Sequence, residues 1–140
     1  MGEAQNHRAE RKRLRVVIAD DTAAIRSSLS SLISRLRDVE IVGLAETGAE
    51  AFELARTLKP DVMTLDIRMP KMTGIQVLEA MQREKIKVMT LVLTGLVGDE
   101  YRDKCLGLGA RHFFHKSTEF EEVLKIMKEQ ADRLNPANEP

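Results

Sequence analysis

The sequence has little of several things that specialised proteins need. Its 140 residues include a single cysteine, Cys105, which excludes an internal disulfide and a cysteine-rich zinc site. It has no tryptophan, one tyrosine and four phenylalanines, too few for a platform that stacks nucleic-acid bases. It contains no apolar run near the roughly 18 residues of a membrane span and no apolar signal-peptide core. We therefore expect a cytoplasmic protein without a membrane contact and without direct nucleic-acid binding.

Net charge is absent as well, because 22 lysines and arginines balance 22 aspartates and glutamates. This balance argues against a general binder of polyanions. The charges are uneven along the chain, with a basic beginning and an acidic end. We expect a basic, disordered leader over residues 1–13, one globular domain over 14–134 and a flexible tail over 135–140.

Within the expected domain, short apolar runs alternate with longer segments of helical periodicity. The runs predict strands at 15–19, 41–45, 62–65, 88–93 and 110–114. The periodic segments predict helices at 23–37, 49–58, 74–83, 99–107 and 119–134. Continuous apolar strands joined by helices indicate parallel strands covered on both faces. We therefore predict an α/β fold of flavodoxin-like (βα)5 type, a doubly wound five-stranded parallel sheet in the order 2-1-3-4-5.

Polar residues follow the strands of this predicted sheet. Asp20 and Asp21 come after the first strand, Asp66 after the third, Thr94 after the fourth and Lys116 after the fifth. Ligands of such sheets bind at the carboxyl ends of the strands, where the strand order reverses. We therefore expect the three carboxylates to converge there, with Thr94 and Lys116 beside them.

Three neighbouring carboxylates repel one another, and a hard divalent cation relieves that repulsion. A site made only of oxygen ligands favours Mg²⁺, with Mn²⁺ as the alternative. A metal, a lysine and a hydroxyl around a carboxylate are suited to phosphoryl transfer to that carboxylate. The competing interpretation is that the acids only cap helices, as Asp21 or Thr22 would for the helix that begins near residue 23.

Four segments in this order resemble the receiver domain of bacterial response regulators. They are Val-Ile-Ala-Asp20-Asp21, Asp66-Ile-Arg-Met-Pro-Lys-Met-Thr-Gly74, Leu-Thr94-Gly95 and Phe113-Phe-His-Lys116. The resemblance extends over about residues 14–134. Receiver domains are themselves a standard example of the strand order 2-1-3-4-5, so this agreement is not independent.

The resemblance implies a role for each matching residue. Asp66 would be the phosphoacceptor, and Lys116 and Thr94 would contact the phosphoryl group. Asp20, Asp21, Asp66 and the backbone carbonyl of Arg68 would hold Mg²⁺, with Asp20 acting mainly through water.

Phosphorylation would also act at a distance from the acceptor. Thr94 and Phe113 would act as switch residues, and the face formed by helix 99–107, strand 110–114 and helix 119–134 would change. Leu96, Tyr101 and Phe113 are candidates for that signalling face.

The resemblance also implies partners. A sensor histidine kinase or a histidine phosphotransfer protein would donate the phosphoryl group, and a downstream protein would read the signalling face, with a homodimer as another candidate assembly. The chain would not be an enzyme beyond self-catalysed phosphotransfer and autodephosphorylation. It would be a single-domain regulator or the excised receiver of a DNA-binding regulator.

The sequence departs from the common receiver pattern at two positions and has one of two usual residues at a third. Ser117 stands where many members have proline, Phe113 where the family often has tyrosine or phenylalanine, and Arg68 where many have asparagine or a small residue. Ser117 leaves open whether the peptide bond after Lys116 is cis.

Three alternatives remain at this point. A Mg²⁺-dependent phosphatase with an aspartate nucleophile usually has a second acid two residues on, where Arg68 stands here. A flavodoxin-like cofactor carrier needs a phosphate-binding loop where Asp20 and Asp21 stand. A receiver-like interaction module would act without phosphorylation.

Overall fold

The computed structural model describes residues 10–96, 98–116 and 118–136. Strands and helices alternate along these residues, as the periodicity predicts. The strands are β1 (Leu14–Ala19), β2 (Val39–Ala45), β3 (Val62–Leu65), β4 (Met89–Thr94) and β5 (His112–His115). The helices are α2 (Ala23–Ile33), α3 (Gly48–Leu58), α4 (Gly74–Arg83), α5 (Asp99–Gly107) and α6 (Phe120–Leu134).

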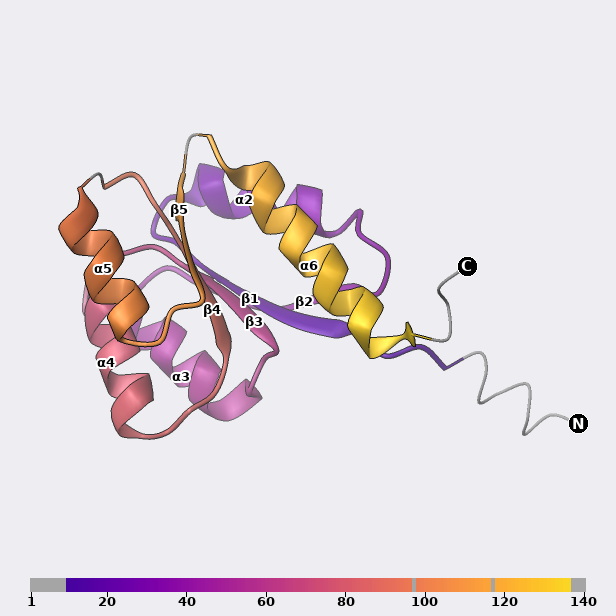
Figure 1. The fold of residues 1–140 in the computed structure, drawn as a ribbon, viewed down its shortest axis with the longest axis horizontal. Helices are drawn as coiled ribbons and strands as arrows, with labels where there is room; N and C mark the ends of the chain where they lie inside the picture. Colours follow the sequence, from indigo (N-terminus) through magenta and orange to yellow (C-terminus); the bar gives the residue numbers. More distant parts are fainter. Residues whose placement is uncertain (1–9, 97, 117, 137–140) are drawn as a thin grey trace, which may run out of the picture.

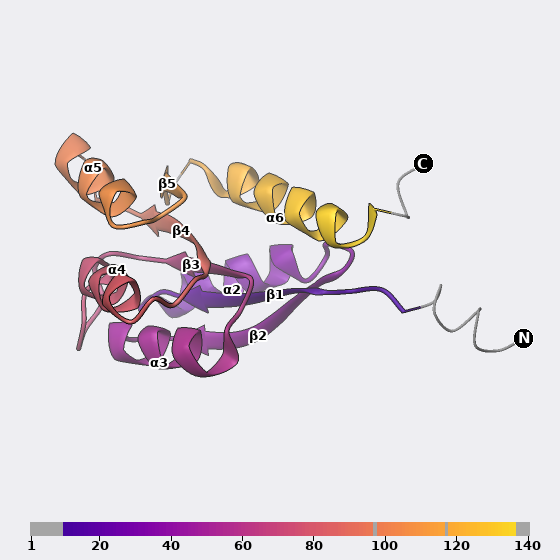
Figure 2. The ribbon, with the colours of Figure 1, turned by 60° about the horizontal axis from the view of Figure 1, so that its bottom comes forward.

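The strands form one parallel sheet in the order β2-β1-β3-β4-β5, which confirms the predicted topology. Helices α2 and α6 cover one face of the sheet, and α3, α4 and α5 cover the other (Figures 1 and 2). The chain moves from β1 outward to β2, then returns to β3 on the other side of β1. The strand order therefore reverses between β1 and β3, where a crevice is expected at the carboxyl ends.

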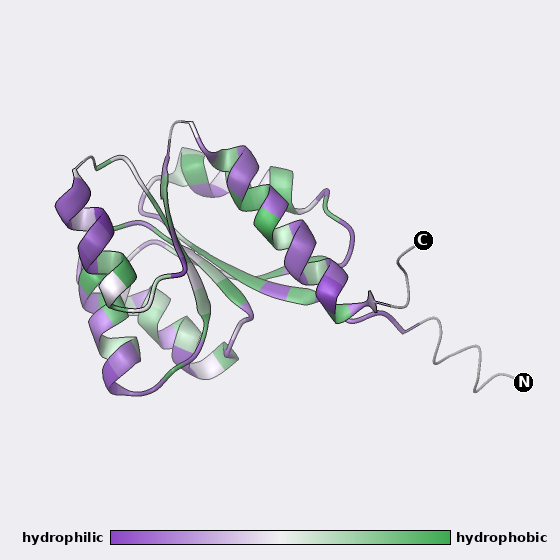
Figure 3. Cartoon of the chain, in the orientation of Figure 1, coloured by the Kyte–Doolittle hydropathy of each residue, from purple (hydrophilic) through white to green (hydrophobic). Residues whose placement is uncertain are grey.

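The core has two parts, because successive strand residues point to opposite faces of the sheet. On β1, Val17 and Ala19 pack toward α3, α4 and α5, whereas Val16 and Ile18 pack toward α2 and α6. All four residues of β3 are buried. Figure 3 shows hydrophobic strands between helices whose outer faces are hydrophilic. Burial on both faces is why these strands appear in the sequence as continuous apolar runs.

Two predicted boundaries differ from the structure in ways that have a physical cause. Helix α2 ends at Ile33 rather than at residue 37, and the chain turns over residues 34–38. Leu36 still packs against the core from that turn, so it continues the helical periodicity without continuing the helix. Strand β5 begins at His112 rather than at residue 110, because the Ala110 amide donates to the Cys105 carbonyl at the end of α5.

At both ends, fixed contacts extend beyond the domain bounds of 14 and 134 that the sequence suggests. Arg11 forms an ion pair with Asp38. The buried Asn135 side chain accepts a hydrogen bond from the Lys12 amide at 3.0 Å and donates to the Lys12 carbonyl at 2.8 Å. The segment before β1 is thereby joined to the end of α6, and the two lie side by side in Figures 1 and 2.

Candidate phosphoryl and cation site

Three carboxylates and one lysine meet at the carboxyl ends of β1, β3 and β5. Asp20, Asp21 and Asp66 each place one carboxylate oxygen within 4.8 Å of the other two. The Lys116 ammonium donates to Asp66 Oδ2 at 2.8 Å and lies 2.8 Å from Asp20 Oδ2. The structure thus brings together four of the five polar residues that the strand ends predict.

Backbone hydrogen bonds continue the sheet into the loops that carry these groups. The Asp20 amide donates to the Ala45 carbonyl of β2, and the Asp66 amide donates to the Ala19 carbonyl of β1, each at 3.0 Å. The Lys116 amide donates to the Thr94 carbonyl at 2.8 Å. Each functional side chain therefore follows directly from the last hydrogen-bonded position of a strand, which fixes its direction.

The interpretation of the acids as helix caps does not hold at α2. Thr22 is the N-cap residue of this helix, and its side chain makes no capping hydrogen bond. The Asp21 carboxylate belongs to the acidic cluster. Asp20 Oδ1 accepts the Thr22 amide at 2.8 Å, which fixes the turn between β1 and α2 and leaves Asp20 Oδ2 beside Lys116.

The surroundings of the site disfavour the charged form of Asp20 and favour the charged form of Lys116. Burial raises the pKa of Asp20, and the neighbouring Asp66 raises it further, although hydrogen bonds from Lys116 and Thr22 act in the opposite direction. Burial also opposes the charge on Lys116, but hydrogen bonds to Asp20 and Asp66 outweigh it and raise the pKa of Lys116. One ammonium therefore compensates two buried carboxylates incompletely.

The residues present fit a hard divalent cation. The donor set is made of carboxylate oxygens, with Asp21 exposed and Asp20 and Asp66 buried, so water has access from one side. Carboxylate and water ligands of this kind suit Mg²⁺ and Mn²⁺. A bound cation would supply the positive charge that is needed to compensate the buried Asp20 carboxylate.

The loop between Asp66 and α4 is closely packed. The Gly74 amide donates to the Ile67 carbonyl at 2.8 Å, and a Cβ atom added to Gly74 would lie 2.3 Å from the Asp66 carbonyl oxygen. Only glycine allows this close approach. The Arg68 side chain is exposed, and the Arg68 amide donates a long hydrogen bond of 3.4 Å to Asp66 Oδ1. An exposed arginine thus stands where the phosphatase alternative would place its second acid.

Thr94 and the predicted signalling residues lie next to this edge. Thr94 is fully buried at the end of β4, and its hydroxyl accepts the Leu96 amide at 3.3 Å. Leu96, Tyr101 and Phe113 are partly buried and pack against the same side of the core, toward α3, α4 and α5. Ser117, where the sequence departs from the common receiver pattern, lies outside the described residues.

Two residues with contacts to the acidic loops were not singled out from the sequence. The Arg26 guanidinium of α2 donates to the Asp20 carbonyl at 2.7 Å. Gly48 begins α3, and its amide donates to the Pro70 carbonyl at 3.1 Å. Helical spacing gives a signal for Arg26, since it lies one turn after the N-cap Thr22 and so above the preceding loop. The sequence gives no comparable signal for Gly48.

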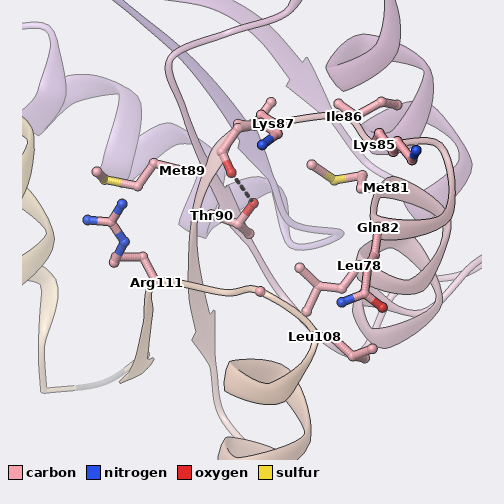
Figure 4. A pocket seen from close by; sticks show the side chains of 12 residues that line it. Leu78, Met81, Gln82, Lys85, Ile86, Lys87, Met89, Thr90, Leu108 and Arg111 are labelled. Carbon is pink, nitrogen blue, oxygen red and sulfur yellow. Dashed lines mark hydrogen bonds between the residues drawn. The ribbon is translucent and has the colours of Figure 1, made fainter.

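A hollow lies at the other end of β4 from Thr94, and none of the acidic-site residues lines it. Figure 4 shows the side chains around this hollow. The hollow has a volume of about 570 Å³, and its wall includes Leu78 and Met81 of α4 and Leu108 after α5. Thr90 donates its hydroxyl to the Val88 carbonyl at 3.2 Å within this wall. No carboxylate lines the hollow, so it does not share the chemistry of the site.

The fold and the site together define a class of protein. A doubly wound parallel sheet carries three carboxylates and a lysine at the point where its strand order reverses. The family model of the response regulator receiver domain matches residues 16–128. The chain therefore belongs to the response regulator receiver domain family, a signalling module of two-component systems.

Relatives and solved structures agree with this assignment. The protein-glutamate methylesterase/protein-glutamine glutaminase 1 of Albidiferax ferrireducens is 43% identical over 110 residues, which cover 76% of this chain and 29% of that protein. This chain therefore spans less than a third of that curated relative. The response regulator domain of Thermotoga maritima CheB matches with a TM-score of 0.75 and 30% identity, covering 92% of this chain and all of that one.

A third match comes from a complex. In the CheX–CheY–BeF3–Mg²⁺ complex of Borrelia burgdorferi, the matching chain has a TM-score of 0.74 and 27% identity, covering 81% of this chain and 86% of that one. Among the residues that the structure describes, no helix is both long enough and apolar enough to span a membrane.

Proposed function

We propose that this receiver domain accepts a phosphoryl group on Asp66 from a phosphohistidine of a sensor histidine kinase or a histidine phosphotransfer protein. The observation that carries the proposal is the position of Lys116, whose ammonium lies 2.8 Å from carboxylate oxygens of both Asp66 and Asp20. Such an ammonium holds a phosphoryl oxygen as soon as the group arrives beside Asp66.

In the proposed step, a carboxylate oxygen of Asp66 attacks the phosphorus atom in line with the bond to the donor imidazole. An O–P bond forms on Asp66 and the P–N bond breaks. The imidazole nitrogen keeps the electron pair of that bond and takes up a proton from water. Lys116 compensates the charge on the equatorial oxygens, and its raised pKa keeps it protonated while it does so.

The proposed ligands for Mg²⁺ are Asp20, Asp21, Asp66 and the backbone carbonyl of Arg68, with Mn²⁺ as a substitute. When bound, the cation supplies charge neutralisation for the incoming phosphoryl oxygens. The protein holds the ligands in place through the hydrogen bonds of the Asp20 and Asp66 amides to neighbouring strands. The Borrelia complex, which contains BeF3 together with Mg²⁺, supports Mg²⁺ as the cation in this proposal.

The proposed output is a change on the face formed by α5, β5 and α6. Thr94 gives up its hydrogen bond with the Leu96 amide to bind the phosphoryl group, and Phe113 repacks with it. Leu96 and Tyr101 lie on the same part of the core as Phe113, so they respond to this change.

A downstream protein would read that face, and a second copy of the domain is the alternative reader. A hollow of about 440 Å³ supports docking there, with a wall that includes Arg102, Leu106, His112 and Phe113. In a longer protein, the same face would regulate an attached domain. Two candidates for such a protein are a methylesterase, as in the relative from Albidiferax ferrireducens, and the DNA-binding regulator that the receiver resemblance implies.

The test is the intact mass of the protein after incubation with acetyl phosphate and Mg²⁺. We expect the parent chain to gain one phosphoryl group, and no gain in Asp66→Asn or when Mg²⁺ is replaced by a chelator. Asp103→Asn is the matched control, because Asp103 is an exposed carboxylate on α5. Equal gain in Asp66→Asn would refute the acceptor, and no gain in the parent at any time point would favour the interaction module that acts without phosphorylation.

A further inference from the structure

The turn between β2 and α3, residues 45–48, contacts both loops that carry the acids. The Ala45 carbonyl accepts the Asp20 amide at 3.0 Å. At the other end of the turn, the Gly48 amide donates to the Pro70 carbonyl at 3.1 Å, in the loop that follows Asp66. We call this segment the β2–α3 turn.

Gly48 sets how closely the turn approaches the loop after Asp66. Gly48 is buried, and a Cβ atom added to it would lie 1.8 Å from the Met72 carbonyl oxygen. The Cβ position is fixed by the backbone of residue 48 and the atom it meets is a backbone oxygen, so a rotamer change cannot relieve the overlap. Any side chain at this position must push the loop of residues 66–74 away from the turn.

Arg26 holds the first acidic loop from the opposite side. Its guanidinium donates to the Asp20 carbonyl at 2.7 Å, and its side chain is only 15% exposed. It also lies 3.8 Å from a Glu46 carboxylate oxygen of the β2–α3 turn. Because Glu46 is 69% exposed, this ion pair contributes little energy, and the bond to the Asp20 carbonyl is the main contact.

The β2–α3 turn is itself fixed on helix α3. The Thr47 hydroxyl accepts the Glu50 amide at 3.0 Å, and the Glu50 carboxylate accepts the Glu46 amide at 2.8 Å. These reciprocal bonds cap the helix and leave the turn little freedom. A rigid segment therefore lies between the loop of Asp20 and the loop of Asp66.

We propose that the β2–α3 turn and Arg26 form a positioning element that sets the spacing between the two acidic loops, and through it the Mg²⁺ affinity and the rate of phosphorylation. The inference rests on the proposed function, because it assigns residues that act on that same site through backbone contacts. Neither Gly48 nor Arg26 contacts a phosphoryl group or a metal in this proposal. They act through the positions of Asp20 and of the loop after Asp66.

The experiment compares Gly48→Ala with Gly43→Ala, a matched control at a glycine of β2, the strand before the turn. The atoms nearest to a Cβ at Gly43 are the ends of the flexible Leu54 and Leu58 side chains, at 3.1 and 3.5 Å. The Mg²⁺ dissociation constant is measured from amide shifts in ¹H–¹⁵N NMR spectra, and phosphorylation by acetyl phosphate is measured by intact mass. Arg26→Met and its control Arg35→Met, which removes an exposed arginine after α2, are measured in the same way.

We expect Gly48→Ala to weaken Mg²⁺ binding about tenfold and to slow phosphorylation by about 10- to 100-fold, since small displacements of reacting groups have effects of that size. Arg26→Met should show the same two changes to a smaller degree, while Gly43→Ala and Arg35→Met stay within twofold of the parent. The Mg²⁺ titration separates positioning from stability, because it is read on the folded population.

Mg²⁺ affinity and phosphorylation of Gly48→Ala within twofold of the parent would overturn the inference. Should Gly48→Ala fail to fold, Arg26→Met decides by the same criterion. A parent chain that binds Mg²⁺ but takes up no phosphoryl group would overturn the proposed function instead. The Mg²⁺ affinities of the variants would then decide the inference by themselves.

Discussion

Asp20 is the residue at which stability and function conflict. The residue is 2% exposed, and its carboxylate shares the Lys116 ammonium with the neighbouring Asp66. Because burial raises its pKa, Asp20 stabilises the fold most when it is protonated. That contribution is complete below the unfolded pKa of about 3.9 and is lost as the pH rises through the raised pKa of the folded state.

We therefore predict that Asp20→Asn stabilises the metal-free protein at pH 7 by about 1 kcal/mol, an increase of roughly 3 °C in Tm. The asparagine keeps the shape of the side chain and removes a charge that Lys116 compensates incompletely. The gain should shrink as the pH falls through the range in which Asp20 of the parent becomes protonated. Thermal unfolding from pH 4 to 8 measures this, and a lower Tm for Asp20→Asn at pH 7 would contradict the argument.

Burial also limits the chemical reactivity of Cys105. Burial raises the pKa of its thiol to about 11, so the thiol stays protonated near neutral pH. It packs in the core on the side of α3, α4 and α5 as a small apolar residue.

Among the helices, α5 has the weakest attachment to the domain. Cys105 is its only buried residue, and its N-cap residue, Gly98, has no side chain that could cap the helix. Helix α4, by contrast, has five buried residues and a capping box made by Thr73 and Gln76. A helix with few buried groups opens locally at a low free-energy cost.

We predict that the amides of α5 exchange with deuterium at least tenfold faster than those of α4 in the unphosphorylated protein. Hydrogen exchange followed by NMR resolves the two helices amide by amide. Equal protection of α4 and α5 would show that α5 is not the element that moves. The change in the proposed output face would then have to come from β5 and α6.

At the scale of the whole molecule, Asn135 joins the two ends of the domain. The Asn135 side-chain nitrogen donates to the backbone carbonyls of Lys12 and Ala131 at 2.8 and 3.2 Å, and the side-chain oxygen accepts the Lys12 backbone amide. We predict that Asn135→Ala lowers the free energy of unfolding by about 1–3 kcal/mol, because buried backbone groups lose their partners. Gln130→Ala on the same helix is the control. Urea unfolding measures both, and a difference under 0.5 kcal/mol would contradict the prediction.

Mg²⁺ should also stabilise the whole domain, since a ligand that binds only the folded state shifts the unfolding equilibrium. At ten times the dissociation constant, the expected gain is about 1.4 kcal/mol. The increase in Tm should saturate with Mg²⁺ and should be absent with NaCl at equal ionic strength. Asp21→Asn should reduce it and Asp103→Asn should not. A similar increase with NaCl would indicate general screening rather than a site.

The sequence by itself determined the strand order and the layers, and it predicted which polar residues would lie together at one edge of the sheet. Apolar runs and helical periodicity are local patterns, and parallel strands place their carboxyl ends at one edge. For this reason Asp20, Asp66 and Lys116 could be predicted to meet before any coordinates were known. The end of α2 could not be predicted from these patterns, because Leu36 packs on the core from a turn that keeps the helical spacing.

Only the tertiary structure decided how the two acidic loops are held. The contact between Gly48 and the Met72 carbonyl joins segments that are distant in sequence and uses backbone atoms, which leave no pattern in residue types. The contacts of Asn135 with the Lys12 backbone likewise join segments that are distant in sequence. Periodicity records which side of an element is buried, whereas the distance between two loops depends on how whole elements pack.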